Sequence, residues 1–318
     1  MPAPMSPGLT HGPVNREPRE NVVVAVDVGG SGVRAARLTG GQLESPVEVS
    51  LTAECTRAQV QERIEAALRD AHDGHCDAVG FSFPAFLDGE GRVRDALNLP
   101  GLNGMDLAAV ARSVTGAEHV AVLPDSAAAA VAEGLAGGGR GVGRVLTIIV
   151  GTGCNAGMTV DGRVVALGGG SLGDAGHGPV AFDDVECWCG GRGCLEAIFS
   201  GIAFDRRAQE LGLGDCRALL EAARAGHAGA REAVERAGVA LGTALATWSA
   251  VLWPERVVVG GGVGLGAGRL LLDVAAQQLR RVGARHLVGG IEIVPSTLGR
   301  GAPLLGAGLA AARAGVLV

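Results

Sequence analysis

The segment VVVAVDVGGSGVRAARL, residues 22–38, is an apolar, β-branched run followed by a glycine turn and a second strand-like run. It predicts a β-hairpin that turns at Gly29 and Gly30. The segment VLTIIVGTGCNAGMTV, residues 145–160, repeats the order of strand, glycine turn and strand, at an offset of about 120 residues. Two halves that each begin with such a hairpin predict a duplicated α/β protein of two lobes. Clefts between lobes are favoured places for ligands.

The remaining segments alternate between strand and helix patterns. After the first hairpin, the apolar residues Val60, Ile64, Ala67, Leu68 and Ala71 recur at the spacing of one helix face. Further strands are expected at residues 78–83, 119–123, 256–259 and 291–294. Further helices are expected at residues 106–114, at 126–135, across about 202–250, and at 303–314.

These elements predict how the chain divides. Residues 1–20 are polar and proline-rich, which indicates a disordered tail. We expect a small first lobe at residues 21–134 and a larger second lobe at 135–302. The helix within residues 303–318 is expected to pack back on the first lobe.

Composition excludes several classes of protein. The net charge is −6 with acids and bases interspersed, so no basic stripe is present that would bind nucleic acid. The seven cysteines are odd in number and mostly dispersed, which argues against a disulfide framework and for a reducing cytoplasm. No uncharged apolar run reaches the roughly 18 residues that suggest a membrane span, and the polar N-terminus is no secretory signal.

The glycine-rich loop 177–194 contains one histidine and three cysteines. His177 is its first residue, and residues 187–194 read CWCGGRGC. Cys3His is a standard ligand set for structural zinc, so we expect zinc on His177, Cys187, Cys189 and Cys194. A catalytic zinc is disfavoured because four protein ligands leave no open position. The alternative is a chance crowding of buried thiols.

Three glycine turns follow strands and are candidates for binding a nucleotide. Backbone N–H groups in such turns can approach phosphate oxygens, and a preceding aspartate can reach Mg²⁺ through water. Each turn alone could be an ordinary connection, and none is a Walker loop because no Gly-Lys-Ser/Thr follows. The candidate residues are Asp27, Gly29, Gly30, Ser31, Gly151, Thr152, Gly153, Gly260, Gly261 and Gly262.

Asp125 follows a predicted strand and begins a predicted helix. Aspartate is a common N-cap, which is its structural interpretation. Its functional interpretation is a general base at the edge of the cleft, which phosphoryl transfer to a hydroxyl requires. Asn98, in Asn98-Leu-Pro100, is a candidate ligand for a hydroxylated molecule or simply part of a loop.

Taken in this order, the motifs resemble the ROK family of sugar kinases and repressors, in the actin-like/hexokinase (ribonuclease H-like) superfamily. The resemblance spans about residues 22–315, and its most specific part is the cysteine motif that ends in Glu196. It implies that Asp125 is the catalytic base, and that Mg-ATP binds at the glycine turns. It also implies an acceptor site formed by Asn98, Asp125, Asp174, His177 and Glu196, and a homodimer or homotetramer.

The chain departs from the family pattern in the acceptor region. Pro124 stands where the family usually has asparagine, and Asp174 where it has glutamate. Ala85 and the segment Cys154-Asn155-Ala156 replace usual glycines. The resemblance therefore implies an ATP-dependent kinase with an altered acceptor: a hexose, an amino sugar or a sugar-like cyclitol.

Two other functions stay open. Pro124 and Asp174 motivate a non-catalytic sugar sensor on the kinase fold. A sugar-responsive transcriptional regulator is disfavoured, because only about 20 residues precede Val22, too few for a helix-turn-helix module.

Overall fold

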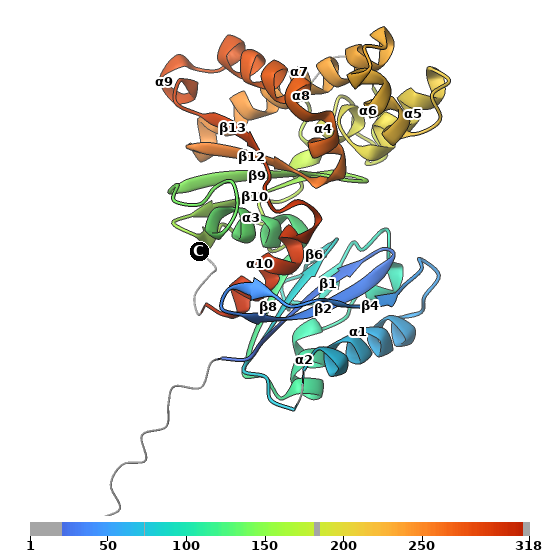
Figure 1. Ribbon diagram of the computed structural model, residues 1–318, viewed down its shortest axis with the longest axis vertical. Coiled ribbons are helices and arrows are strands. Elements are labelled where there is room, and N and C mark those ends of the chain that lie inside the picture. The colour runs from blue at the N-terminus through green and yellow to red at the C-terminus, as the bar shows by residue number, and fades with distance from the viewer. Residues whose placement is uncertain (1–20, 73, 181–184, 314–318) are drawn as a thin grey trace, which may run out of the picture.

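A computed structural model of the protein describes residues 21–72, 74–180 and 185–313. The predicted tail 1–20 lies outside the described residues. Two β-sheets form the core of the molecule, one above the other in Figure 1, with helices between them and on their outer faces. Within the described ranges, no helix has the length and apolar content needed to cross a bilayer.

The first sheet begins with the predicted hairpin. Strands β1 (Val23–Gly29) and β2 (Gly32–Thr39) pair antiparallel, and β5 and β8 then extend the sheet in parallel with β1. The strand order is β3-β2-β1-β5-β8, with β4 also on β2. The other bounds are Gln42–Leu43 for β3, Val47–Ser50 for β4, Ala78–Phe83 for β5 and His119–Pro124 for β8.

The second sheet repeats this arrangement. Strands β9 (Arg144–Val150) and β10 (Cys154–Val160) form the antiparallel hairpin, and β12 and β13 extend it in parallel with β9. The order is β11-β10-β9-β12-β13, with β11 at Arg163–Val164, β12 at Arg256–Gly260 and β13 at Glu292–Pro295. The duplication expected from the two glycine hairpins is therefore confirmed, strand by strand.

The helices that end the two halves are exchanged between the sheets. Helix α3 (Asp125–Leu135) follows the first sheet but packs mainly on β9 and β10, whereas α10 (Ala302–Ala311) follows the second sheet and packs on β1 and β5. Both helices lie between the sheets in Figure 1, against each other. A Cβ atom on Gly306 of α10 would lie 1.7 Å from the carbonyl oxygen of Ala128, so only glycine permits this approach.

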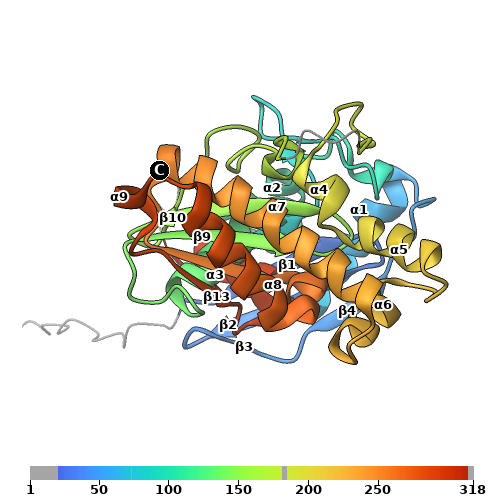
Figure 2. The ribbon, with the colours of Figure 1, turned by 90° about the horizontal axis from the view of Figure 1, so that it is seen from above.

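The outer helices complete the two lobes. Helix α1 (Arg57–Ala71) begins with a capping box at Thr56 and buries the five apolar residues predicted for its face. It lies with α2 (Leu107–Thr115) on the first sheet. On the second lobe, the long helices α7 (Ala228–Leu252) and α8 (Gly261–Val282) lie side by side over the sheet (Figure 2).

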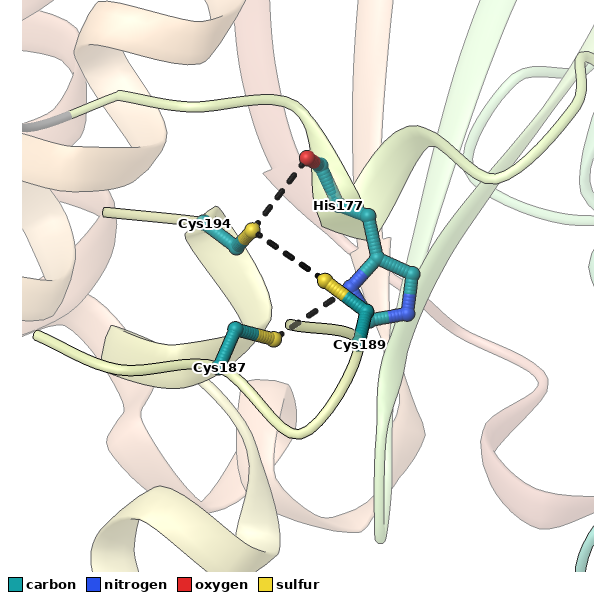
Figure 3. Close-up of side chains that lie close together, drawn as sticks. All are labelled: His177, Cys187, Cys189 and Cys194. Atoms are coloured by element: carbon teal, nitrogen blue, oxygen red, sulfur yellow. Dashed lines mark hydrogen bonds between the residues drawn. The ribbon is translucent and has the colours of Figure 1, made fainter. Parts of the chain in front are cut away.

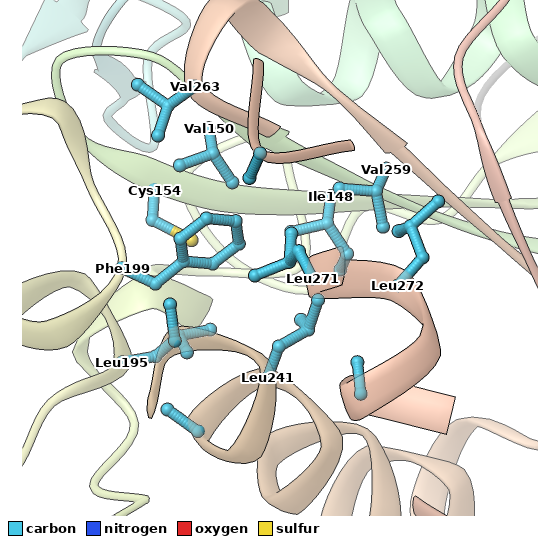
Figure 4. Close-up of a cluster of buried hydrophobic side chains, with 14 of the residues drawn as sticks. Ile148, Val150, Cys154, Leu195, Phe199, Leu241, Val259, Val263, Leu271 and Leu272 are labelled. Atoms are coloured by element: carbon cyan, nitrogen blue, oxygen red, sulfur yellow. The ribbon is translucent and has the colours of Figure 1, made fainter. Parts of the chain in front are cut away.

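The core of the second lobe joins these helices to the sheet. Leu241 of α7 and Leu271 of α8 are buried against Ile148 and Val259 of the strands (Figure 4). Apolar aliphatic side chains dominate this core. The remaining helices are α4 (Leu195–Ile198), α5 (Gly201–Glu210), α6 (Cys216–Arg224) and α9 (Arg285–Val288).

The helices expected across about 202–250 are present as α5, α6 and α7, which are separated by turns at residues with positive φ, including Gly212, Gly214 and Gly226. The strand β4 and the short pair β6 (Phe86–Leu87) and β7 (Val93–Arg94) were not predicted. Three single 3₁₀ turns occupy Pro100–Leu102, Ala175–His177 and Gly299–Gly301.

Candidate active site

Two adjoining cavities lie where the two lobes meet. The larger has a volume of about 1170 Å³ and the smaller about 600 Å³. Ser31 of the first lobe and Ile149, Gly151 and Thr152 of the second line both cavities. A molecule in one cavity can therefore meet a molecule in the other at the two glycine turns.

Residues from all three predicted glycine turns border the larger cavity. They are Asp27, Gly29, Ser31, Gly151, Thr152, Gly261 and Gly262. Gly261 and Gly262 are the first residues of α8, so this cavity faces the N-terminal end of its first, short segment, which ends at a kink at Gly268. Free N–H groups and the helix dipole at such an end favour anions such as phosphate. Gly260 is buried at the end of β12 and does not line the cavity.

Arg34 bridges the two lobes in this cavity, and sequence reasoning missed it. Its guanidinium donates to the Asp27 carboxylate at 2.5 Å and to the carbonyl oxygen of Arg300 at 3.3 Å. Arg34 and Asp27 are direct partners in the β1–β2 hairpin. The register of the predicted hairpin was thus a signal that could have found the pair, since cross-strand partners of opposite charge attract.

Asp125 lines the smaller cavity. It is half-buried as the first residue of α3, and its carboxylate accepts the N–H of Ser126 at 2.7 Å. The N-cap position itself belongs to Pro124, so the N-cap interpretation of Asp125 is wrong. Burial raises the pKa of Asp125 to about 6, and the nearby charge of Asp27 acts in the same direction. A carboxyl group with such a pKa suits proton transfer near neutral pH.

The other predicted acceptor ligands lie around the same cavity. Asn98, Asp174, His177 and Glu196 all line it, as do Gly30 and Gly153. Nε2 of His177 is 3.6 Å from an oxygen of Asp174 and 3.8 Å from one of Glu196. A Cβ on Gly153 would lie 2.5 Å from Glu196, so the second turn must be glycine for this carboxylate to reach the cavity.

Both oxygens of Glu196 accept hydrogen bonds from the protein. The backbone N–H of Cys154 donates to Oε2 at 2.7 Å, and the indole N–H of Trp188 donates to Oε1. Trp188 and Asn155 also line the cavity, and sequence reasoning had assigned no role to either. The side chain of Asn155 accepts the N–H of Ala175, which fixes the start of the 3₁₀ turn that carries His177.

The predicted metal ligands come together (Figure 3). One ligand atom from each of His177, Cys187, Cys189 and Cys194 lies within 4.8 Å of all the others. Nδ1 of His177 is 3.4 Å from the Cys187 sulfur, and the sulfurs of Cys189 and Cys194 are 3.8 Å apart. Zinc–sulfur bonds of about 2.3 Å in a tetrahedron separate two sulfurs by about 3.8 Å. The four residues therefore fit a structural zinc ion in number, type and spacing.

The two ring nitrogens of His177 point to different groups. Its Nδ1 atom points to the cysteines and its Nε2 atom to Asp174 and Glu196. A ring held on one nitrogen by a metal has the other free to donate to a carboxylate or a ligand. This geometry links the cysteine loop to the smaller cavity.

Only some of the residues that differ from the ROK family pattern line the smaller cavity. Ala85, Cys154, Asn155 and Asp174 line it. Pro124 does not, because it is buried at the end of β8, near Gly170. Pro124 therefore offers no side chain to a molecule in the cavity.

The duplicated sheets and the cleft between them define the two-lobed actin-like/hexokinase fold. The sequence pattern of the ROK family matches residues 23–314, and the chain belongs to this family. It is 33% identical to kanosamine kinase of Amycolatopsis mediterranei, over 91% of this chain and 97% of that one. It is 29% identical to glucokinase of Halalkalibacterium halodurans, over 90% and 93%.

Solved structures agree with this placement. The ROK hexokinase of Thermus thermophilus superposes with a TM-score of 0.76 at 31% identity, over 91% of this chain and 97% of that one. The ROK family glucokinase of Streptomyces griseus, solved with glucose and AMPPNP, has a TM-score of 0.74 at 28% identity, over 92% and 99%.

Proposed function

We propose that this protein is an ATP-dependent kinase that phosphorylates a hydroxyl group of a hexose or a sugar-like polyol. The observation that carries the proposal is the position of Asp125. Its carboxylate lines the smaller cavity, which adjoins the larger cavity at Ser31, Gly151 and Thr152. The related kanosamine kinase and glucokinases are named for reactions of this class.

In this proposal the larger cavity holds ATP. Backbone N–H groups of Gly29, Ser31 and Thr152 bind the phosphates, and Gly261 and Gly262, which line the cavity beyond the buried Gly260, leave room for the adenosine. Asp27 holds Mg²⁺ through water, and the ion neutralises charge on the phosphates. Arg34 lies beside Asp27 and supplies a further positive charge toward the phosphates.

The smaller cavity holds the acceptor. Asn98, Asp174, His177 and Glu196 bind acceptor hydroxyls and orient the ring. Asp125 takes the proton of the attacking hydroxyl while the oxygen forms its bond to the γ-phosphorus and the bond to ADP breaks. Closure of the lobes excludes water, which otherwise accepts the phosphoryl group.

The metal has a structural function in this proposal. His177, Cys187, Cys189 and Cys194 hold zinc, which folds the loop and fixes the ring of His177 toward the acceptor. With four protein ligands the ion takes no part in the phosphoryl transfer.

Among possible acceptors, an amino sugar fits the charge of the smaller cavity. Four carboxylates line it, from Asp95, Asp125, Asp174 and Glu196, and no arginine is among its described lining residues. A protonated amine gains from such surroundings, whereas an acidic sugar is repelled. The similarity to a kanosamine kinase supports the same choice.

The test is ADP release in the presence of Mg-ATP with a panel of acceptors: glucose, glucosamine, kanosamine, N-acetylmannosamine and a cyclitol. We expect turnover with at least one member, and the highest kcat/KM for an amino sugar. Binding of these sugars with no ADP release above the acceptor-free rate would instead support the sugar-sensor alternative. Equal kcat/KM for glucose and the amino sugars would contradict only the proposed preference for an amino sugar and would leave the kinase function standing.

We further propose that the enzyme works in the cytoplasm as a homodimer or homotetramer. The first sheet, with α10, and the second sheet, with α3, move against each other about the cleft, so the moving bodies differ from the sequence segments 21–134 and 135–302 by these two helices. Light scattering of the purified protein gives the oligomeric state, and a monomer at working concentration would contradict this part of the proposal.

A further inference from the structure

Trp188 belongs to the cysteine loop and also borders the acceptor cavity. It stands between Cys187 and Cys189, two of the four metal-ligand candidates. Its side chain is 61% exposed although it is large and mostly apolar. The indole is nevertheless held in one orientation. Its N–H donates to Glu196, and its ring meets the imidazole of His177 edge-on, with centroids 4.7 Å apart and planes at 79°.

A second exposed apolar side chain borders the same cavity from the other lobe. Leu97, in the loop that precedes Asn98, is also 61% exposed. Trp188 comes from the second lobe and Leu97 from the first. The cavity thus has apolar side chains on both of its walls, beside the polar groups that bind hydroxyls. Sugar rings have apolar C–H faces, and aromatic rings are well suited to pack on them.

The hydrogen bond between Trp188 and Glu196 limits what the acceptor can carry. It places the edge of the indole against the carboxylate that borders the cavity. A substituent on the acceptor that points to Oε1 of Glu196 meets the indole first. A small hydroxyl or amino group needs little room there, whereas an acyl group requires the indole to move.

We propose that Trp188 determines acceptor specificity by packing on the acceptor ring and excluding acceptors that carry an N-acyl group on the side facing Glu196. The inference rests on the kinase function proposed above. It predicts a preference for glucose or an unsubstituted amino sugar over N-acetylhexosamines.

The first test is kinetic. In Trp188→Ala we expect kcat/KM for glucose and glucosamine to fall while that for N-acetylglucosamine holds or rises. The ratio of acylated to unacylated kcat/KM then increases about tenfold or more, the usual scale for a change in pocket shape. Trp188→Phe keeps a ring but loses the N–H that donates to Glu196, so we expect its ratio to lie between those of wild type and Trp188→Ala. A ratio in Trp188→Ala within twofold of wild type would overturn the inference.

The second test is spectroscopic and needs no turnover. The chain has three tryptophans and no tyrosine, so its intrinsic fluorescence comes from Trp188, Trp248 and Trp253. Trp253 ends α7 and is 58% exposed but does not line the acceptor cavity, which makes Trp253→Phe the matched control. We expect acceptor binding to change the emission of wild type and Trp253→Phe, and to leave that of Trp188→Phe unchanged.

Different results would contradict the inference on Trp188 and the proposed kinase function. A fluorescence response that persists in Trp188→Phe, in an enzyme that turns over its acceptor, would overturn the inference and leave the kinase function standing. An absence of ADP release with every acceptor would overturn the kinase function, and the inference with it. If Trp188→Ala does not fold, the fluorescence of Trp188→Phe still decides, because a response to acceptor that persists in this variant would overturn the inference.

Discussion

The surroundings of Asp125 affect both its proposed function as a base and its contribution to the stability of the fold. The carboxylate is partly removed from water and lies near the negative charge of Asp27, and both effects disfavour its ionised form. Its pKa rises to about 6 from an ordinary 3.8. A general base works only in the ionised form, so the environment sets the pH at which the enzyme is active.

We therefore predict that kcat/KM decreases about tenfold per pH unit below pH 6. An initial-rate series from pH 4.5 to 8, with stability checked at each pH, measures it. A profile that stays flat down to pH 4.5 would show that Asp125 is not the base or is not buried in the working enzyme.

The same pKa has a consequence for stability, with a definite sign. Because the folded-state pKa is raised, the protonated form favours folding, and this contribution is lost as pH rises from about 4 through 6. Asp125→Asn cannot ionise, so we expect it to be more stable than wild type at pH 8, by on the order of 1–3 kcal/mol. At pH 3.5 the two should unfold at the same temperature. A wild-type protein more stable than the variant at pH 8 would reverse the sign and contradict the argument.

Single residues also show how far the sequence could predict the site. His177 and the cysteines stand in a motif with metal-ligand spacing, and Asp125 stands where a predicted strand is followed by a predicted helix, so the sequence alone identifies them as candidates. Arg34 stands opposite Asp27 in the predicted hairpin, which was an available signal, but its contact with Arg300 depends on tertiary geometry. Trp188 lies inside the cysteine motif, but its hydrogen bond to Glu196 could not be inferred from the spacing of that motif. Pro124 occupies a position of the family's acceptor motif, yet it does not line the cavity.

At the scale of elements, the proposed zinc site makes the cysteine loop the segment whose order should depend on an ion. The loop carries His177, Trp188 and the start of α4, on which Glu196 lies. Removal of zinc should unfold this loop and weaken acceptor binding by roughly tenfold or more, since a metal site and its surrounding fold form together. ATP binding at the larger cavity should change little.

Calorimetric titration of acceptor and nucleotide before and after chelation, with zinc added back as control, measures both effects. Elemental analysis of freshly purified protein should give about one zinc per chain. Protein without zinc that still binds acceptor normally would contradict the structural function of the metal.

The second prediction at this scale concerns the contact between the exchanged helices α3 and α10. Gly306 of α10 lies against the backbone of Ala128 in α3, and an added methyl group would overlap the carbonyl oxygen. Gly306→Ala must separate the helices that join the sheets, so we expect a loss of stability of about 1–3 kcal/mol or more. Gly290→Ala is the control, because an added methyl there meets nothing within 4 Å. Equal melting temperatures of the two variants would contradict this packing.

The packing of α3 on the second sheet is the part of the fold that was hardest to predict, whereas the return of the C-terminal helix to the first lobe was expected from the sequence. Alternation and β-branched runs predicted the strands of both hairpins, and the 3.6-residue spacing predicted the buried face of α1. Helix α3 is buried along residues Ser126–Gly134 on all sides. A helix that is apolar all round has no periodic face, so its sequence does not indicate which sheet it packs on.

At the scale of the whole molecule, duplication explains why the site lies where it does. Each half places a glycine turn after the first strand of its hairpin, and both turns face the cleft between the lobes. The larger cavity takes residues from the glycine turns, from β4 and from helices α5, α6 and α8. The smaller one takes Asn98 and Asp125 from the first half and His177 and Glu196 from the second. In the proposed mechanism, closure of the lobes would bring these groups onto the acceptor together.

The central claim is that one carboxylate in this cleft accepts the proton of the hydroxyl that receives the phosphoryl group. The most direct measurement compares wild type and Asp125→Asn in ADP release with saturating acceptor, alongside ATP affinity by titration. We predict a loss of turnover of roughly 10²-fold or more with ATP affinity unchanged. Turnover within a few-fold of wild type would contradict the account.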